Sequence, residues 1–189
     1  MVKIKICGLT RPQDIEVVNL EKPDYIGFVF AESKRKVTPP QAVDLKKILS
    51  PDIISVGVFV NETVDNILYL VYNGVIDIIQ LHGSEDEQYI EKLKMLTGKK
   101  IIKANSNSYS ADYLLFDNIM PGSGQTFDWD LIGEVSKPYF LAGGLNVENI
   151  NEAIIKTAPF AVDSSSGVET GGVKDPVKIK EFIRRVRNG

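Results

Sequence analysis

Eight short runs rich in β-branched and aromatic residues recur along this chain, and stretches with helical periodicity separate most of them. Such alternation predicts βαβ units, in which parallel strands form a sheet covered by helices. The expected strands are residues 2–7, 25–30, 54–60, 76–81, 100–104, 113–116, 139–141 and 160–163. Eight parallel strands are the number that closes a TIM barrel. The sequence therefore predicts an α/β fold, a compact (β/α)8 barrel, with residues 1–189 forming a single domain.

The length of the chain constrains how this barrel is built. At 189 residues it lies just below the ~200-residue lower end of the fold, so the loops must be short. Only residues 105–111 separate the fifth and sixth expected strands, which is less than the usual crossover of about a dozen residues. Helix five is therefore expected to be short or missing. The alternative, an open doubly wound sheet, is disfavoured because no G-x-G-x-x-G follows the first strand.

Composition excludes several functional classes. Hydrophobic residues at 43% and charged residues at 25% are ordinary globular values. The balance of 22 basic against 25 acidic residues contains no basic block, which argues against nucleic-acid binding. No apolar run approaches the roughly 18 residues of a membrane span, so no membrane partner is expected. One cysteine, and charges within residues 1–5 where a signal peptide needs its apolar core, indicate a cytoplasmic protein.

The only cysteine stands at the end of the first expected strand. The two-residue strand period places Lys3, Lys5 and Cys7 on one face and Ile4 and Ile6 on the other. If the apolar face packs under helices, the thiol points into the barrel at the carboxyl end of a strand, where α/β enzymes place their chemistry. A free cysteine is equally often a small buried hydrophobe. Position alone leaves both interpretations open.

Two polar loops follow the seventh and eighth expected strands. The first contains Gly143 and Gly144, and the second contains Ser164 and Ser165. Glycines let the backbone approach an anion, and the N-termini of the following helices favour negative charge. A single Gly-Gly pair would be explained as well by a tight turn. The two loops together predict a phosphate site, because TIM barrels often build one after strands seven and eight.

A basic loop, residues 32–36, follows the second expected strand. Arg35 within it offers a planar fork that binds a carboxylate through two hydrogen bonds. The alternative is an ordinary solvated surface loop. The sequence therefore makes Arg35 a candidate contact for an acidic ligand.

An acid ends the sixth expected strand. Asp117 directly follows three apolar residues, for which a purely structural explanation is hard to find. Asp128 competes with it for a catalytic role, but Asp128 is also well placed to cap a helix. Residues 122–124, Gly-Ser-Gly, are typical of a lid. His82 ends the fourth strand, and a lone histidine is more often structural than catalytic.

Several of these segments, taken in order, closely resemble the phosphoribosylanthranilate isomerase family of tryptophan biosynthesis over nearly the whole chain. The segments are Lys5-Ile6-Cys7-Gly8, Gly27-Phe28-Val29-Phe30 with Ser33-Lys34-Arg35, Gly57-Val58-Phe59-Val60-Asn61, Gln80-Leu81-His82-Gly83, Gly122-Ser123-Gly124 with Thr126-Phe127-Asp128-Trp129, Gly143-Gly144-Leu145, and Ala161-Val162-Asp163 with Ser165-Ser166-Gly167-Val168-Glu169. The single pieces are common, but their combination is highly specific.

The resemblance implies an Amadori rearrangement of a phosphorylated small molecule, N-(5-phosphoribosyl)anthranilate, without a cofactor or a metal. One group protonates the furanose ring oxygen and another removes the proton from C2′. The resemblance implies Cys7 as general base, Asp117 as general acid, Arg35 as the contact for the anthranilate carboxylate, Asp163 as the residue that orients the substrate amine or hydroxyls, and Gly143, Gly144, Ser164 and Ser165 as phosphate-binding residues.

The chemistry sets requirements on both catalytic groups. A thiol with a pKa near 8.5 acts as a base only where its thiolate is stabilised, and Lys5 on the same strand face is a candidate partner. Asp117 must be protonated, which needs an apolar pocket or a neighbouring negative charge. The alternatives are a histidine-pathway phosphoribosyl sugar isomerase, expected to use carboxylates at both positions, and a non-catalytic phosphate-binding barrel. A monomer and a homodimer are both compatible with the sequence.

Overall fold

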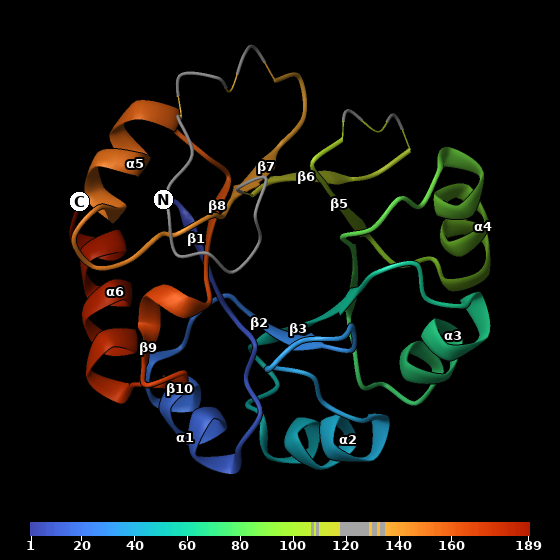
Figure 1. Ribbon diagram of the computed structural model, residues 1–189, viewed down its shortest axis with the longest axis horizontal. Coiled ribbons are helices and arrows are strands. Elements are labelled where there is room, and N and C mark those ends of the chain that lie inside the picture. Colours follow the sequence, from blue (N-terminus) through green and yellow to red (C-terminus); the bar gives the residue numbers. More distant parts are fainter. Residues whose placement is uncertain (107, 109, 118–128, 130–131, 133–134) are drawn as a thin grey trace.

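Eight parallel strands close into a barrel in the computed structural model, which describes residues 1–106, 108, 110–117, 129, 132 and 135–189. Each strand pairs with the next along the chain, and β8 closes the ring on β1 (Figure 1). The strands are β1 (Lys3–Cys7), β2 (Tyr25–Val29), β3 (Ile54–Phe59), β4 (Ile78–Leu81), β5 (Ile101–Ala104), β6 (Tyr113–Phe116), β7 (Tyr139–Leu141) and β8 (Ala161–Ser164). All eight predicted strands are present, so the predicted barrel is confirmed.

Helices surround the strands on the outside of the ring (Figure 1). They are α1 (Pro12–Glu21), α2 (Pro39–Ile48), α3 (Val64–Tyr72), α4 (Glu87–Thr97), α5 (Ile150–Thr157) and α6 (Pro176–Asn188). Their starts follow from local capping. The Thr63 side chain accepts the N–H of Asn66 before α3, and the Asp175 side chain accepts two backbone N–H groups before α6. A two-stranded hairpin, β9 (Glu169–Thr170) and β10 (Val173–Lys174), lies between β8 and α6.

The fifth unit is as short as predicted. Between β5 and β6, the part of the chain that the structure describes contains no helix. Lys94 on α4 spans this interval by donating to the Ser110 carbonyl and to the Asp112 carboxylate. The other Asp112 oxygen accepts the N–H of Ile101, so it ties the loop to the start of β5.

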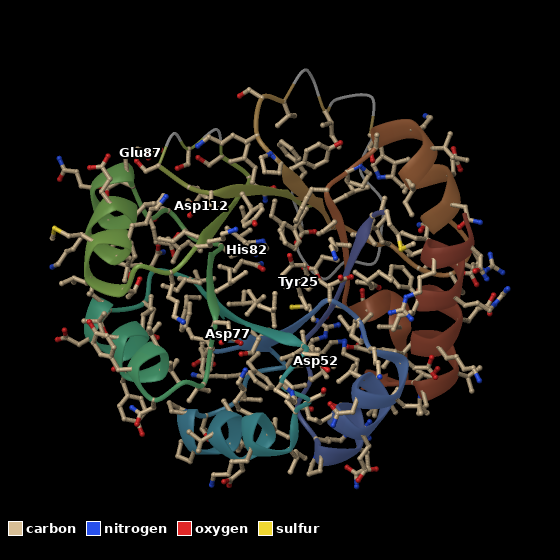
Figure 2. All side chains as sticks on the ribbon, turned by 180° about the vertical axis from the view of Figure 1, so that it is seen from behind. Tyr25, Asp52, Asp77, His82, Glu87 and Asp112 are labelled. Atoms are coloured by element: carbon tan, nitrogen blue, oxygen red, sulfur yellow. The ribbon has the colours of Figure 1, made fainter. Side chains whose placement is uncertain are left out.

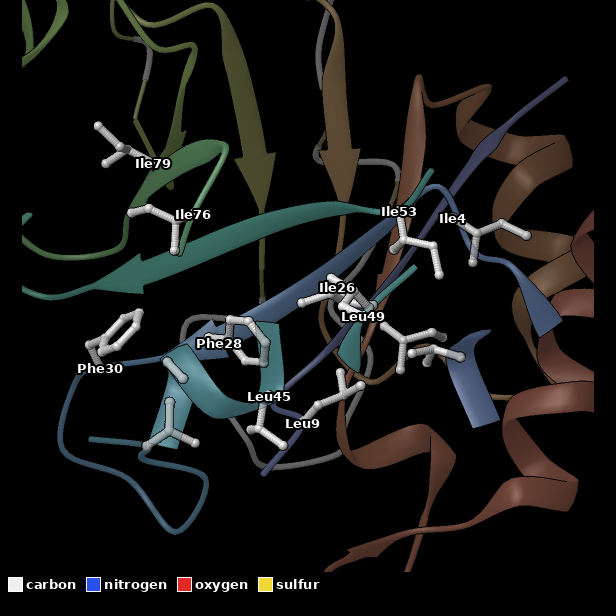
Figure 3. Packing of buried hydrophobic residues seen from close by; sticks show 14 of the residues in the cluster. Ile4, Leu9, Ile26, Phe28, Phe30, Leu45, Leu49, Ile53, Ile76 and Ile79 are labelled. Carbon is white, nitrogen blue, oxygen red and sulfur yellow. The ribbon is translucent and has the colours of Figure 1, made fainter. Parts of the chain in front are cut away.

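Two apolar clusters reflect the two faces of the strands. Ile4, Ile26 and Phe28 point outward and pack with Leu45 and Leu49 between strands and helices (Figure 3). The inner cluster fills the barrel with residues of the opposite parity: Tyr25, Val56, Ile78, Ile102, Ala104, Tyr113, Leu115, Phe140, Ala142 and Ala161. Because the interior is packed with side chains, any substrate site must lie at an end of the barrel.

The segment before α4 differs from the sequence-based expectation. Residues 85–87 are three consecutive acids, a pattern that predicts the first turn of a helix, but α4 begins at Glu87 and Asp86 is its N-cap. Glu85 is buried before the helix, where it accepts the N–H of Gly83 and pairs with Lys103 at 3.2 Å. Lys103 on β5 thus balances the charge of the buried Glu85.

Candidate active site

The thiol of Cys7 lies at the carboxyl end of β1, on the inner face of the barrel. Ile4 and Ile6 point to the outer core and Lys5 and Cys7 to the interior, as the strand period predicted. Cys7 pairs in register with Gly27 of β2. A Cβ atom at Gly27 would lie only 2.6 Å from Cys7 Sγ, so the glycine leaves the space that the sulfur occupies.

A buried ion pair lies directly below the thiol. Lys5 is completely buried, and its Nζ atom donates to Asp163 Oδ2 of the neighbouring strand β8 at 2.6 Å. Burial by itself lowers the pKa of Lys5, but Asp163 and Cys7 outweigh it, and the net shift is upward, so Lys5 is cationic. The second carboxylate oxygen, Asp163 Oδ1, is buried and has no hydrogen-bond partner among the residues described. An acceptor of this kind is suited to a ligand donor.

The environment of Cys7 favours the neutral thiol in the unliganded protein. Burial is the largest influence and raises its pKa, Lys5 acts in the opposite direction, and the net shift is upward. Lys5 therefore contacts the thiol as the sequence suggested, yet it does not by itself produce a thiolate. Its strongest partner is Asp163.

Asp117 follows β6 at the same end of the barrel, where its side chain is 15% exposed. Its N–H donates to Asn105 Oδ1, and its Oδ2 atom lies 3.4 Å from His82 Nε2. The Gln80 amide nitrogen lies 3.3 Å from the other ring nitrogen of His82, and His82 Nε2, which faces Asp117, makes no hydrogen bond to the described residues. Figure 2 shows His82 toward the middle of the barrel. Asp163 interacts electrostatically with both Asp117 and His82, so strands β4, β6 and β8 converge here.

The two predicted phosphate loops pack against each other. Gly143 and Gly144 both have positive φ angles, 81° and 71°, which glycine adopts without strain. The Ser164 hydroxyl is buried and donates to the Leu145 carbonyl at 2.7 Å, so this side chain joins the loops. A Cβ atom at Gly167 would lie 1.9 Å from that carbonyl oxygen, so the approach requires glycine.

Ser165 links the second loop to the catalytic strand. Its hydroxyl donates to the Cys7 carbonyl oxygen at 3.0 Å. The Lys174 ammonium group donates to the Ser165 carbonyl at 2.8 Å. The first contact holds the loop after β8 against the end of β1, and the second ties this loop to β10.

Arg35 reaches across the end of the barrel and packs on Gly8. A Cβ atom at Gly8 would lie 2.4 Å from Arg35 Cδ, and Gly8 also has a positive φ angle of 80°. The guanidinium donates two hydrogen bonds to Glu169, from Nε at 2.6 Å and from Nη2 at 2.9 Å. The Arg35 side chain is only 13% exposed, which is too buried for an ordinary solvated surface loop.

The structure thus brings the predicted residues to one end of the barrel and adds others. His82, Gln80, Glu169 and Lys174 were given no role by sequence reasoning. The position of Glu169 in the sequence could have been used, because a carboxylate close to a predicted phosphate loop is expected to pair with a cationic side chain. The competing acid Asp128 lies outside the described residues.

This arrangement defines a class of protein: a (β/α)8 barrel enzyme with a thiol, a carboxyl group and two loops rich in glycine and serine at the carboxyl ends of its strands. In the described residues, no helix is long and apolar enough to cross a membrane. Residues 4–185 match the family model of N-(5′-phosphoribosyl)anthranilate (PRA) isomerase.

Individual proteins show the same similarity. The N-(5′-phosphoribosyl)anthranilate isomerase of Endomicrobium trichonymphae is 50% identical, with 100% of both chains covered. The crystal structure of the phosphoribosyl anthranilate isomerase of Thermotoga maritima superposes with a TM-score of 0.88 at 38% identity, covering 100% of both chains. A further crystal structure of such an isomerase, in complex with reduced 1-(o-carboxyphenylamino)-1-deoxyribulose 5-phosphate, has a TM-score of 0.84 at 36% identity and also covers 100% of both chains. The chain belongs to the N-(5′-phosphoribosyl)anthranilate isomerase family.

Proposed function

We propose that this chain catalyses the Amadori rearrangement of N-(5′-phosphoribosyl)anthranilate to 1-(2-carboxyphenylamino)-1-deoxy-D-ribulose 5-phosphate, with Cys7 as general base and Asp117 as general acid. The observation that carries the proposal is that both side chains extend from strand ends at one end of the barrel, and Asp163 interacts electrostatically with each of them. The test is whether purified protein abolishes the fluorescence of phosphoribosylanthranilate, and whether this requires both residues.

The two proton transfers follow from this placement. Asp117 donates its proton to the furanose ring oxygen, which opens the ring as the C1′–O bond breaks and an iminium forms. Cys7, as the thiolate, then removes the proton from C2′, and the electron pair of that bond forms the enolamine. The His82 contact of 3.4 Å is longer than a good hydrogen bond, which is common in an unliganded catalytic site. His82 positions Asp117 in this scheme.

The binding contacts divide between the two ends of the substrate. The backbone of Gly143, Gly144 and Ser165 binds the phosphate, while Ser164 supports these loops through its bond to Leu145. The unpartnered Asp163 Oδ1 accepts a hydrogen bond from the substrate amine or a hydroxyl. Arg35 contacts the anthranilate carboxylate.

Arg35→Ala is expected to raise KM for the anthranilate substrate by about 10–150-fold, because a hydrogen bond to a charged group contributes roughly 1.5–3 kcal/mol. For an aniline analogue that lacks the carboxylate, the same substitution should raise KM far less. Steady-state kinetics with both substrates measures the difference. Equal losses would show that Arg35 acts on the phosphate or on the fold, and no loss for either substrate would show that Arg35 does not contribute to substrate binding.

The titration of Cys7 gives a test that does not depend on turnover. Burial raises the pKa of this thiol. In a pH titration of the unliganded protein, the midpoint of the thiolate absorbance is therefore expected above the ordinary thiol pKa of about 8.5. Cys7→Ser serves as the control, since it removes the only thiol and leaves the tyrosines. A midpoint below that of a free thiol would show that Lys5 outweighs burial and that the thiolate is present before substrate binds.

We also propose that residues 1–189 act as one cytoplasmic domain, as a monomer or a homodimer. One solved relative is described as a monomeric form of the dimeric enzyme of Thermotoga maritima, so both states are compatible with this fold.

A further inference from the structure

We propose that Glu169 is a positioning residue that orients Arg35 for the anthranilate carboxylate and thereby sets the selectivity of the site for a carboxylated ligand. The inference rests on the proposed role of Arg35. Glu169 lies on the hairpin after β8, and its carboxylate accepts hydrogen bonds from Arg35 in the loop after β2.

The Arg35 guanidinium has two forks, and Glu169 occupies only one of them. A guanidinium carries five N–H groups in one plane. Glu169 accepts from Nε and Nη2, which form the lateral edge of the group. Nη1 makes no hydrogen bond to the residues that the structure describes, and with the second N–H of Nη2 it forms the terminal edge. That edge matches a second carboxylate through two parallel hydrogen bonds.

The position of Arg35 is fixed from two sides. Its aliphatic part packs on Gly8, where even a methyl group would collide with it. Glu169 holds the lateral edge of the guanidinium, and this bond raises the pKa of Arg35, so the side chain stays cationic. An arginine that is already oriented loses less conformational freedom when it binds a ligand. Glu169 therefore acts on the anthranilate carboxylate through Arg35.

Glu169 is in turn braced by Lys174. The Lys174 ammonium group donates to Glu169 Oε1 at 2.6 Å and to the Ser165 carbonyl at 2.8 Å. Glu169 is 5% exposed and lies among three cations: Arg35, Lys174 and, at 3.8 Å, Lys34. The hydrogen bonds and charges of Arg35 and Lys174 outweigh burial and lower the pKa of Glu169, so it remains a carboxylate. The brace fixes the carboxylate against the loop after β8, which itself bonds to the end of β1.

The test is a titration of wild type and Glu169→Gln with two ligands. One is reduced 1-(o-carboxyphenylamino)-1-deoxyribulose 5-phosphate and the other is the same compound without the carboxyl group. Glu169→Gln keeps the size of the side chain but removes its charge and replaces one of the two acceptor oxygens with an amide donor. We expect about a tenfold loss of affinity for the carboxylated ligand, the lower limit for one charge-assisted hydrogen bond, and little change for the other ligand. In steady-state kinetics, KM should rise with kcat nearly unchanged.

Glu181→Gln is the matched control. Glu181 also accepts hydrogen bonds from arginines, Arg184 and Arg185, but it lies on α6 among exposed side chains. Glu181→Gln should change the affinity for neither ligand. When Arg35→Ala is already present, adding Glu169→Gln should cause no further loss of affinity that is specific to the carboxylated ligand. Glu169→Asp, which keeps the charge and shortens the reach, should lower carboxylate selectivity in the same direction and replaces the glutamine variant if that variant fails to fold.

The outcomes separate this inference from the proposed function. If Arg35→Ala loses carboxylate selectivity and Glu169→Gln and Glu169→Asp do not, the positioning role is overturned and the role of Arg35 stands. If Arg35→Ala weakens the binding of both ligands equally, or of neither, the proposed contact between Arg35 and the carboxylate is wrong. Equal losses of both ligands in the Glu169 variants also overturn the inference, because they place Glu169 in the phosphate site or in the fold.

Discussion

Cys7→Ser is expected to lower kcat by about 10²–10⁴-fold, the usual contribution of a general base, while leaving folding and ligand affinity nearly unchanged. Serine is close to cysteine in size and fills the space beside Gly27, but its hydroxyl is a far weaker base at neutral pH. The rate is measured from the fluorescence decay of phosphoribosylanthranilate.

The controls for Cys7→Ser follow from its neighbours. Because the Lys5–Asp163 pair does not depend on the sulfur, the melting temperature and the affinity for the reduced product analogue should match those of the wild type. Turnover within a few-fold of wild type would remove Cys7 from the mechanism. A large loss of ligand affinity would instead show that the substitution has disturbed the site.

Asp117→Asn is expected to produce a loss of kcat of similar size, about 10²–10⁴-fold, because an amide cannot deliver a proton to the ring oxygen. The substitution preserves shape, and its amide oxygen still provides an acceptor for His82 Nε2. The same fluorescence assay measures the loss. Binding of the reduced product analogue, which undergoes no proton transfer, should change much less.

Asp128→Asn is the comparison that tests the assignment of the acid. Only Asp117 comes directly after a barrel strand, so Asp128→Asn should mainly affect stability or lid closure. If Asp128→Asn reduced kcat more than Asp117→Asn does, the general acid would be Asp128. A few-fold effect from both would indicate that neither aspartate carries the proton.

Much of the fold was predictable because strand signals are local. The two-residue alternation of Ile4 and Ile6 against Lys5 and Cys7 determined which face of β1 meets the helices and which faces the interior. The short interval after β5 left no room for a helix. In a parallel barrel the carboxyl ends of all strands lie at the same end of the barrel. Cys7 and Asp117 were therefore expected at that end before any contact was known.

Local pattern could mislead where a side chain had a distant partner. Glu85 seemed to belong to a helical first turn because acids favour that position, yet it lies before the helix and pairs with Lys103 on β5. The Ser164 hydroxyl donates to the Leu145 carbonyl, 19 positions away in the chain. In both cases a buried polar group is satisfied by a partner that sequence spacing does not reveal.

The sequence by itself determined the barrel, the inner face of β1 and the strand ends that carry chemistry, because these depend on periodicity and on residues adjacent in the chain. Only the tertiary structure decided which buried charged side chains pair with one another. Lys5 meets Asp163 across the junction where β8 closes on β1, and Arg35 meets Glu169 although 134 positions separate them. Such pairs form because closure of the barrel brings distant strand ends together, and burial then requires each charge to find an opposite charge.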